Sequence, residues 1–254
     1  MKNTSTHSQA IDLNADLGEG SPYDEAILAI VSSANISCGA HAGDDTAIND
    51  AIRFAKKYDV VIGAHPSYPD WENMGRKSLA ISLSSLADSV FKQLTHIDQQ
   101  AKKSDAELRY VKAHGALYND MAGDEKLARN FCQWVIDFNA SLAVMGLAGS
   151  AVARACNAMN IPFIAEAFID RRYQADGTLV SRSQVGATIR DSATAVKQAL
   201  QLIEDQSVTT LEGQTITVQA DSLCLHGDSP EALVIAKQLR SALAENHIAI
   251  KATR

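Results

Sequence analysis

The 254-residue sequence predicts an α/β fold built on a parallel sheet that closes into a barrel. Three observations carry this prediction. Short apolar runs alternate seven or eight times with longer stretches of helical period, which is the pattern of strands joined by helical crossovers. The length is normal for one α/β barrel. The glycine-rich first turn typical of open dinucleotide-binding sheets does not occur, which favours closure.

Seven apolar runs are the predicted strands. Several are nearly continuous in apolar character, as expected of parallel strands that are covered on both faces. They span residues 11–17, 34–38, 60–65, 108–114, 142–147, 161–168 and 222–226. A Glu212-Gly213 turn between β-prone residues predicts a small hairpin around 208–218, and residues 248–251 could form one more strand.

Helices are predicted where apolar residues recur at i, i+3 and i+4, because this spacing places them on one helix face. The last predicted helix begins at Ser229-Pro230, a capping residue followed by a proline at the first helical position. The apolar stripes are Ile48, Ala51, Ile52 and Ala55; Leu83, Leu86, Val90, Leu94 and Ile97; Leu127, Phe131, Trp134, Val135 and Phe138; Ile189, Ala193, Val196, Leu200 and Ile203; and Leu233, Ile235, Ala236, Leu239 and Leu243.

Composition excludes several classes of function. Hydrophobic residues make up 46% and charged residues 21%, close to the average of soluble globular proteins. The net charge of -7, with both signs mixed along the chain, argues against a nucleic-acid surface, which needs a basic stripe. No segment approaches the apolar length of a membrane span. We therefore expect neither nucleic acid nor a membrane as a partner.

Residues 1–10 are polar and lack the apolar run of a signal peptide, so we expect them to form a flexible tail. Four scattered cysteines without a C-x-x-C pair fit a reducing compartment, and we expect a cytoplasmic protein. No linker or repeat divides residues 11–254, which predicts one domain. A homo-oligomer remains compatible with the sequence.

Titratable side chains follow nearly every predicted strand. Four of the seven histidines lie at the carboxyl ends of strands, and these ends converge on one face of a barrel. We therefore predict one shared site. Its candidate residues are Asn14, Asp16, Glu19, His41, Asp44, His65, Lys112, His114, Glu166, Asp170, Arg171, Arg182, His226 and Asp228.

These residue types support two kinds of chemistry. Histidines and carboxylates can carry protons to and from an amide or a hydroxyl, and they are also the usual nitrogen and oxygen ligands of a divalent metal. No H-x-x-x-H or H-E-x-x-H spacing occurs, so the sequence does not decide whether a metal is bound. Lys112, Arg171 and Arg182 can bind a carboxylate or a phosphate. No G-x-x-x-x-G-K-[ST] loop occurs, so any nucleotide is held in another way or by another chain.

At these same residues the chain resembles the LamB/YcsF family. The resemblance runs from about residue 11 to the C-terminus and rests on an ordered set of six motifs. They are I-D-L-N-A-D-L-G-E-G (11–20), S-A-N-I-S-C-G-A-H-A-G-D (33–44), I-G-A-H-P-S-Y-P-D (62–70), V-K-A-H-G-A-L-Y-N (111–119), E-A-F-I-D-R-R-Y-Q-A-D-G-T-L-V-S-R (166–182) and L-C-L-H-G-D (223–228).

The resemblance implies a distorted seven-stranded parallel barrel related to carbohydrate deacetylase-like barrels. It also implies a role in opening 5-oxo-L-proline to L-glutamate, coupled to hydrolysis of ATP, together with two partner subunits, B and C. From the shared strand-end placement we hypothesise that Asp16, His41, His65 and His114 handle protons. The cations Lys112, Arg171 and Arg182 would then hold carboxylate or phosphoryl oxygens.

Two other interpretations remain open. The chain could be a metal-dependent hydrolase that acts alone, such as a deacetylase, and a stoichiometric divalent ion at His41 and His65 would favour it. It could instead be a non-catalytic protein that only binds partners. The density of polar groups on the strand-end loops speaks against the second interpretation, because a scaffold does not need them.

Overall fold

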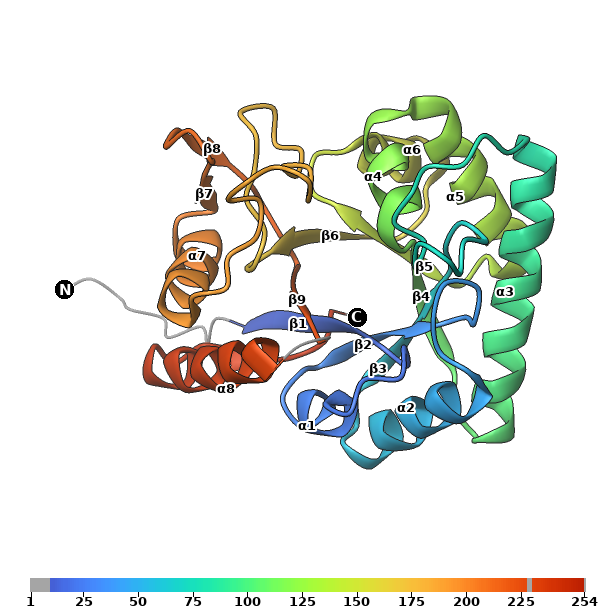
Figure 1. The fold of residues 1–254 in the computed structure, drawn as a ribbon, viewed down its shortest axis with the longest axis horizontal. Coiled ribbons are helices and arrows are strands. Elements are labelled where there is room, and N and C mark those ends of the chain that lie inside the picture. The colour runs from blue at the N-terminus through green and yellow to red at the C-terminus, as the bar shows by residue number, and fades with distance from the viewer. Residues whose placement is uncertain (1–9, 228–229, 254) are drawn as a thin grey trace.

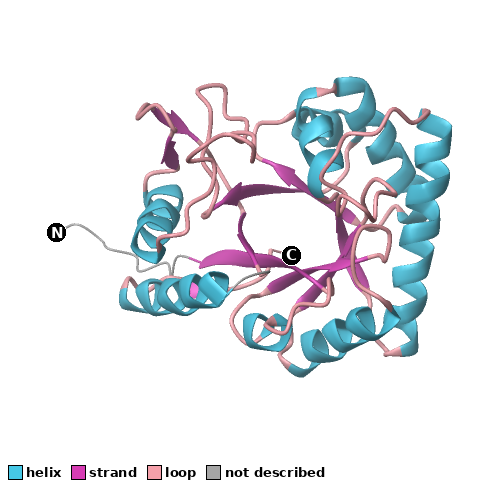
Figure 2. Ribbon diagram, in the orientation of Figure 1, coloured by secondary structure: helices cyan, strands magenta, loops and turns pink. Residues whose placement is uncertain are grey.

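Seven parallel strands form a closed barrel at the centre of the computed structural model, which describes residues 10–227 and 230–253 (Figure 1). The strands pair in the order β1-β2-β3-β4-β5-β6-β9, and β9 pairs with β1 to close the ring. Helices surround the barrel on the outside (Figure 2). The predicted class and strand number are confirmed.

The barrel strands lie close to the predicted apolar runs. They are β1 (Ala10–Leu17), β2 (Ser33–Ser37), β3 (Val61–His65), β4 (Leu108–Lys112), β5 (Ala143–Leu147), β6 (Phe163–Phe168) and β9 (Ser222–His226). The predicted hairpin consists of β7 (Ser207–Thr209) and β8 (Thr215–Thr217), which pair antiparallel, and Gly213 in its turn has a φ of 85°. The short β10 (Ala249–Ile250) pairs with the beginning of β1.

Each of the five predicted stripes lies wholly or mostly on a helix. These helices are α2 (Asp45–Lys57), α3 (Leu83–Lys103), α5 (Glu125–Asn139), α7 (Ser192–Glu204) and α8 (Pro230–Glu245). Ile189 precedes α7, because the Asp191 carboxylate accepts a hydrogen bond from the Thr194 N–H and so caps the helix there. Three short helices were not predicted: α1 (Asp24–Leu28), α4 (Gly115–Gly123) and α6 (Ala151–Met159).

Polar side chains fill much of the barrel interior. Along β1 the apolar Leu13 and Ala15 alternate with Asp12 and Asn14, and all four are buried. The strand thus presents apolar groups to the surrounding helices and polar groups to the barrel axis. Asn14 Nδ2 donates to Ser222 Oγ at 2.7 Å, and Asn35 Nδ2 donates to Asn14 Oδ1 at 2.7 Å. These hydrogen bonds compensate the loss of water around buried polar groups.

The predicted tail, residues 1–10, falls outside the described residues except for Ala10, which begins β1. The capping residue Ser229 falls outside them as well. Within the described ranges, no helix combines the length and the apolar character that crossing a membrane requires.

Candidate active site

A cavity of about 670 Å³ opens at the carboxyl ends of the barrel strands. Its size is in the usual range of small-molecule sites. The cavity gathers side chains from the ends of β1, β4, β6 and β9, and the ring of Phe168 completes its wall. The predicted site residues that line it are Asp16, Glu19, Lys112, His114, Arg171, Arg182 and His226.

Three buried histidines form one cluster at the edge of this cavity. His65 ends β3, while His41 and His114 follow β2 and β4 closely. The rings of His41 and His114 stack, with centroids 3.8 Å apart and planes inclined by 8°. His114 Nδ1 lies 2.9 Å from His65 Nε2. The prediction that these histidines would share a site agrees with this geometry.

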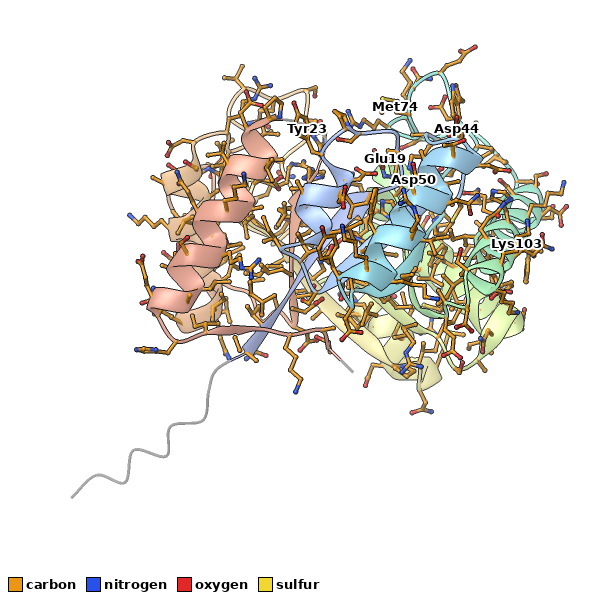
Figure 3. The ribbon with its side chains drawn as sticks, turned by 90° about the horizontal axis from the view of Figure 1, so that it is seen from below. Glu19, Tyr23, Asp44, Asp50, Met74 and Lys103 are labelled. Carbon is orange, nitrogen blue, oxygen red and sulfur yellow. The ribbon has the colours of Figure 1, made fainter. Side chains whose placement is uncertain are left out.

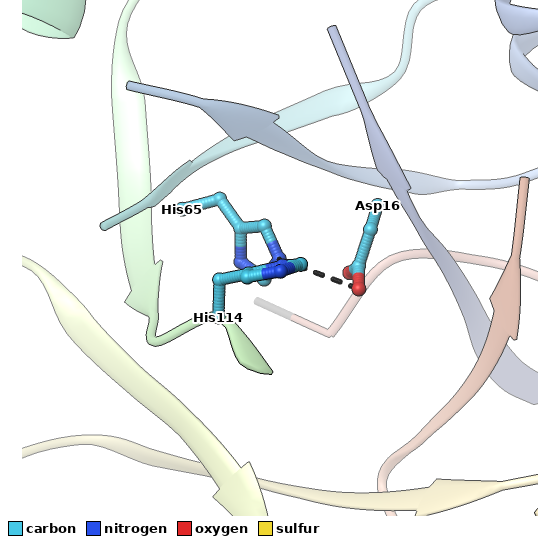
Figure 4. Close-up of side chains that lie close together, drawn as sticks. All are labelled: Asp16, His65 and His114. Carbon is cyan, nitrogen blue, oxygen red and sulfur yellow. Dashed lines mark hydrogen bonds and ion pairs between the residues drawn. The ribbon is translucent and has the colours of Figure 1, made fainter. Parts of the chain in front are cut away.

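Two carboxylates face the inner nitrogens of the cluster. Asp16 Oδ2 lies 3.3 Å from His65 Nε2, and Figure 4 shows this pair together with His114. Glu19 Oε1 lies 3.1 Å from His41 Nε2 and 3.5 Å from His114 Nδ1. The side chains of Asp16 and Glu19 are each only 11% exposed. Nitrogen and oxygen donors thus converge on a small volume that is shielded from water.

The outer nitrogens of the three histidines contact oxygen atoms of the protein. His65 Nδ1 lies 2.8 Å from the Lys112 carbonyl, and His114 Nε2 lies 3.0 Å from the Met74 carbonyl. Since a carbonyl only accepts, both nitrogens carry a proton. His41 Nδ1 lies 3.0 Å from Ser67 Oγ, whose own proton goes to the Tyr68 carbonyl at 2.7 Å. His41 Nδ1 therefore also donates.

Backbone geometry brings the Met74 carbonyl to His114. Met74 has a φ of 52°, a left-handed conformation that is uncommon for a residue with a long side chain. At Gly115, where φ is 59°, an added Cβ would lie 2.5 Å from the Gly75 carbonyl oxygen. Only glycine allows the 66–80 loop to approach the β4 end so closely.

Burial keeps two of the histidines neutral. It lowers the pKa of His41, although the nearby Glu19 carboxylate opposes this effect. Burial lowers the pKa of His114 even more, to well below its ordinary range, and the neighbouring His65 and His41 act in the same direction. Neutral imidazoles can accept a proton or bind a cation through their inner nitrogens.

Lys112 lies inside the barrel next to the cluster. Its Nζ is 2.9 Å from Asp16 Oδ1 and 2.6 Å from Glu166 Oε1, and its side chain is 2% exposed. Burial disfavours the ammonium charge, but the Asp16 carboxylate, Cys224 and the Glu166 carboxylate outweigh burial and raise the pKa of Lys112 well above its ordinary value. Lys112 is therefore a fixed positive charge that is already paired with two carboxylates.

A second group of polar residues forms another part of the cavity wall, next to Asp16. Asp170 Oδ2 accepts from His226 Nδ1 at 2.7 Å, which leaves Nε2 as the acceptor, and Arg182 Nη2 donates to it at 2.6 Å. The ring of Phe168 stacks on His226. Arg171 is buried, and its Nη2 donates to the Val180 carbonyl. Of the two arginines, Arg182 is the one exposed toward the mouth.

The remaining candidates lie elsewhere. Asn14 is buried in the barrel interior and accepts from Lys112 Nζ at 3.3 Å. Asp44 is exposed and caps α2, with its Oδ1 accepting from the Ala47 N–H at 2.9 Å. Figure 3 shows Asp44 toward the same end of the molecule as Glu19 and Met74. Asp228 is outside the described residues.

Sequence reasoning missed the groups that hold the histidines. Ser67 and Met74 contact His41 and His114, and Gln93 of α3 binds both backbone groups of Ser67. One signal was present for Gln93, because it interrupts the apolar stripe of its helix three residues after Val90. A polar residue on a buried face needs hydrogen-bond partners. The Met74 carbonyl had no such signal, since any residue carries one.

Comparison with known proteins gives close relatives over almost the whole chain. The sequence is 45% identical over 242 residues to the 5-oxoprolinase A subunit of Haemophilus influenzae strain PittEE, covering 95% of this chain and 99% of that protein. It is 46% identical over 248 residues to the 5-oxoprolinase A subunit of Bordetella parapertussis, covering 96% and 98%. The crystal structure of a lactam utilization protein from Thermus thermophilus superposes with a TM-score of 0.89 at 34% identity, covering 96% and 100%.

More distant structures share the fold alone. A family 4 carbohydrate esterase from Streptomyces lividans superposes with a TM-score of 0.54 at 7% identity, covering 95% of this chain and 91% of the esterase. This likeness confirms the predicted relation to carbohydrate deacetylase-like barrels. A profile of the LamB/YcsF family matches residues 11–254. The chain therefore belongs to the LamB/YcsF family.

Proposed function

We propose that this chain is the A subunit of an ATP-dependent 5-oxoprolinase, which opens the lactam of 5-oxo-L-proline to L-glutamate. The observation that carries the proposal is the histidine and carboxylate cluster at the barrel mouth. It supports hydrolysis of an amide, and the relatives that are 45% and 46% identical carry the name of the 5-oxoprolinase A subunit.

The coupling to ATP has a chemical reason. A five-membered lactam is a stable amide with a poorly electrophilic carbonyl carbon. Transfer of the γ-phosphoryl group of ATP to the lactam oxygen makes this carbon open to attack by water. The ring C–N bond then breaks, the nitrogen takes up a proton, and phosphate leaves. The balance is 5-oxo-L-proline, ATP and water to L-glutamate, ADP and phosphate.

The residues of the cavity wall suit different parts of this reaction. Arg182 is an exposed cation at the mouth, and we assign it to the substrate carboxylate or to phosphoryl oxygens. The Asp170–His226 pair leaves His226 Nε2 as a hydrogen-bond acceptor, and this nitrogen holds the Arg182 guanidinium in place. We assign His114 and Asp16, which also line the cavity, to the reacting carbonyl. Lys112 and Arg171, both buried and engaged, stabilise the cavity wall.

We place ATP on the partner subunits B and C or between them and this chain. The sequence contains no Walker-type phosphate loop, which supports a shared or external nucleotide site. The names of the relatives, which describe one subunit of an enzyme, fit an assembly with further subunits.

The test is glutamate release from 5-oxo-L-proline and ATP, measured with this chain alone, with subunits B and C alone, and with the mixture. We expect release only from the mixture. His114→Ala should lower it by about 10²- to 10⁴-fold, the usual effect of losing a group that acts directly in proton transfer or charge stabilisation. The matched control is His96→Ala, which removes a histidine that pairs with Asp45 on the helical surface. Full release without this chain would contradict the proposal.

A metal-dependent hydrolase that acts alone is the second candidate, because the donors around His114 could hold a divalent ion. The preparation of this chain alone, used in the test above, also distinguishes this candidate from the 5-oxoprolinase subunit. Hydrolysis of an acetylated sugar by the chain without partners or ATP would favour the second candidate. A bound ion would also favour it but would not decide between the two candidates, since a lactam-opening enzyme can also use one.

A further inference from the structure

We propose that the cluster at the barrel mouth binds one divalent transition-metal ion through Asp16, His65 and His114 (Figure 4), with Glu19 and His41 beside it. Two groups of side chains have ligand atoms within 4.8 Å of one another, Asp16–His65–His114 and Glu19–His41–His114. The inference concerns the chain by itself and holds whichever substrate the cavity accepts.

The first argument is the direction of the lone pairs. Because the three outer nitrogens donate to the Lys112 carbonyl, the Met74 carbonyl and Ser67 Oγ, the inner nitrogen of each ring has a lone pair whenever the ring carries no second proton. The inner nitrogens of His65 and His114 then face each other at 2.9 Å, and that of His41 faces a carboxylate oxygen at 3.1 Å. Acceptors at such distances repel unless a cation lies between them. Histidines held by oxygen atoms at the outer nitrogen are also the usual arrangement around a metal.

The second argument is charge. With neutral histidines, the ionised groups Asp16, Glu19, Glu166 and Lys112 sum to −2. These groups have little or no exposure, and uncompensated buried charge is costly. One divalent cation would neutralise the cluster. Two protons added to the imidazoles would charge at least one ring of the His41–His114 stack, whose centroids are 3.8 Å apart.

The third argument is spacing and stoichiometry. Metal–ligand bonds of about 2.0–2.2 Å place neighbouring donors about 3 Å apart. The measured separations of 2.9, 3.1, 3.3 and 3.5 Å are close to this value. Both groups of donors use His114 Nδ1, whose single lone pair can bind only one ion. The site therefore takes one ion per chain.

The donor set selects the kind of ion. Two imidazoles and a carboxylate favour Zn²⁺ or a similar first-row ion over Mg²⁺ or Ca²⁺, which prefer oxygen alone. When bound, such an ion supplies a Lewis acid at the cavity wall.

The test uses the full chain and Zn²⁺ as the probe. Elemental analysis of the purified chain, and calorimetric titration of the chelator-stripped chain with Zn²⁺, should give one ion per chain. Absorption of the Co²⁺-loaded chain should show bands of histidine coordination. His65→Gln and His114→Gln should each weaken Zn²⁺ binding more than about 100-fold, and Ser67→Ala, which loses the partner of His41, about 10-fold.

His96→Ala is the matched control and should bind like the unchanged chain, since its histidine pairs with Asp45 outside the cluster. Circular dichroism of the stripped variants checks that they fold. A folded chain that takes up no Zn²⁺, or takes it up equally well in the two glutamine variants, overturns the metal site. Glutamate release by such a metal-free chain with its partners would leave the proposed function standing.

Discussion

At the scale of single residues, the contacts of Lys112 inside the barrel determine how its charge is used. Its type and place suggested a binder of anions, yet Asp16 and Glu166 occupy its ammonium group inside the barrel. The sequence shows that His65 and His114 each lie at the end of a predicted strand, so their proximity could be predicted from the sequence. Ion pairs across the barrel depend on which strands face each other, and a linear pattern does not contain this.

Asp24 gives a prediction for the pH dependence of stability. It is 8% exposed, its Oδ2 accepts from the Gly18 N–H at 2.9 Å, and its Oδ1 has no partner within the described part of the chain. Burial raises the pKa of Asp24 to about 6, although the Gly18 bond opposes it. A raised carboxyl pKa stabilises the fold below the unfolded value, and this stability is lost as the pH rises through about 6.

Asp24→Asn should therefore leave stability nearly unchanged at pH 4 and increase it at pH 7.5 by about 3 kcal/mol, the energy that corresponds to the pKa change. Urea unfolding at both pH values measures this. Asp88→Asn, on the exposed face of α3, is the control and should stay within about 0.5 kcal/mol of the unchanged chain. An Asp24→Asn effect of equal size at both pH values would contradict the assignment.

At the scale of elements, the longer hydrophobic patterns were sufficient to locate the strands and helices. The apolar runs located all seven barrel strands, and the stripes located α2, α3, α5, α7 and α8. The short helices escaped for physical reasons. α1 has five residues, too few for a stripe, and α4 begins inside the motif after β4, whose glycine and polar residues resemble a loop. α6 is rich in alanine, so its apolar face stands out little from the rest.

Helix α3 gives the prediction at this scale. Gln93 Oε1 accepts from the Ser67 N–H at 2.9 Å, and its Nε2 donates to the Ser67 carbonyl at 2.8 Å. The helix thus fixes the residue that orients His41. Gln93→Leu should cost about 1–3 kcal/mol, because buried backbone groups lose their partners. It should also lower glutamate release by the assembled enzyme by about 10- to 100-fold through misplacement of the cluster.

The matched control is Gln100→Leu. Gln100 is a buried glutamine on the same helix, but it accepts from Lys103 Nζ and has no hydrogen bond to the 66–80 loop in the described structure. Denaturation and activity measured together separate the two roles. Gln100→Leu should change stability alone. If both variants lose stability and keep full activity, Gln93 only packs the helix and does not position the site.

At the scale of the whole molecule, closure of the barrel decides whether the site exists. Residues Asp16 and His226, from opposite ends of the chain, are neighbours only because β9 pairs with β1 in register, Asp16 beside His226. Open and closed parallel sheets have the same strand pattern, so periodicity could favour closure but not establish it. Closure depends on the side chains that face inward where β1 pairs with β9, the β1–β9 seam.

Ser222 is the residue at this seam with the largest expected effect. Its Oγ accepts from Asn14 Nδ2 at 2.7 Å and donates to Asp12 Oδ2, so Ser222→Ala leaves two buried polar groups of β1 without their partner. Ser33→Ala is the matched control, since Ser33 Oγ only donates to the same Asp12 carboxylate from β2 at 2.8 Å. Urea unfolding should show a loss of roughly 2–3 kcal/mol for Ser222→Ala and about 1 kcal/mol for Ser33→Ala.

Because the seam also places His226 beside Asp16, only Ser222→Ala should lower glutamate release as well. Equal losses of stability in the two variants would mean that the polar seam does not hold the barrel closed.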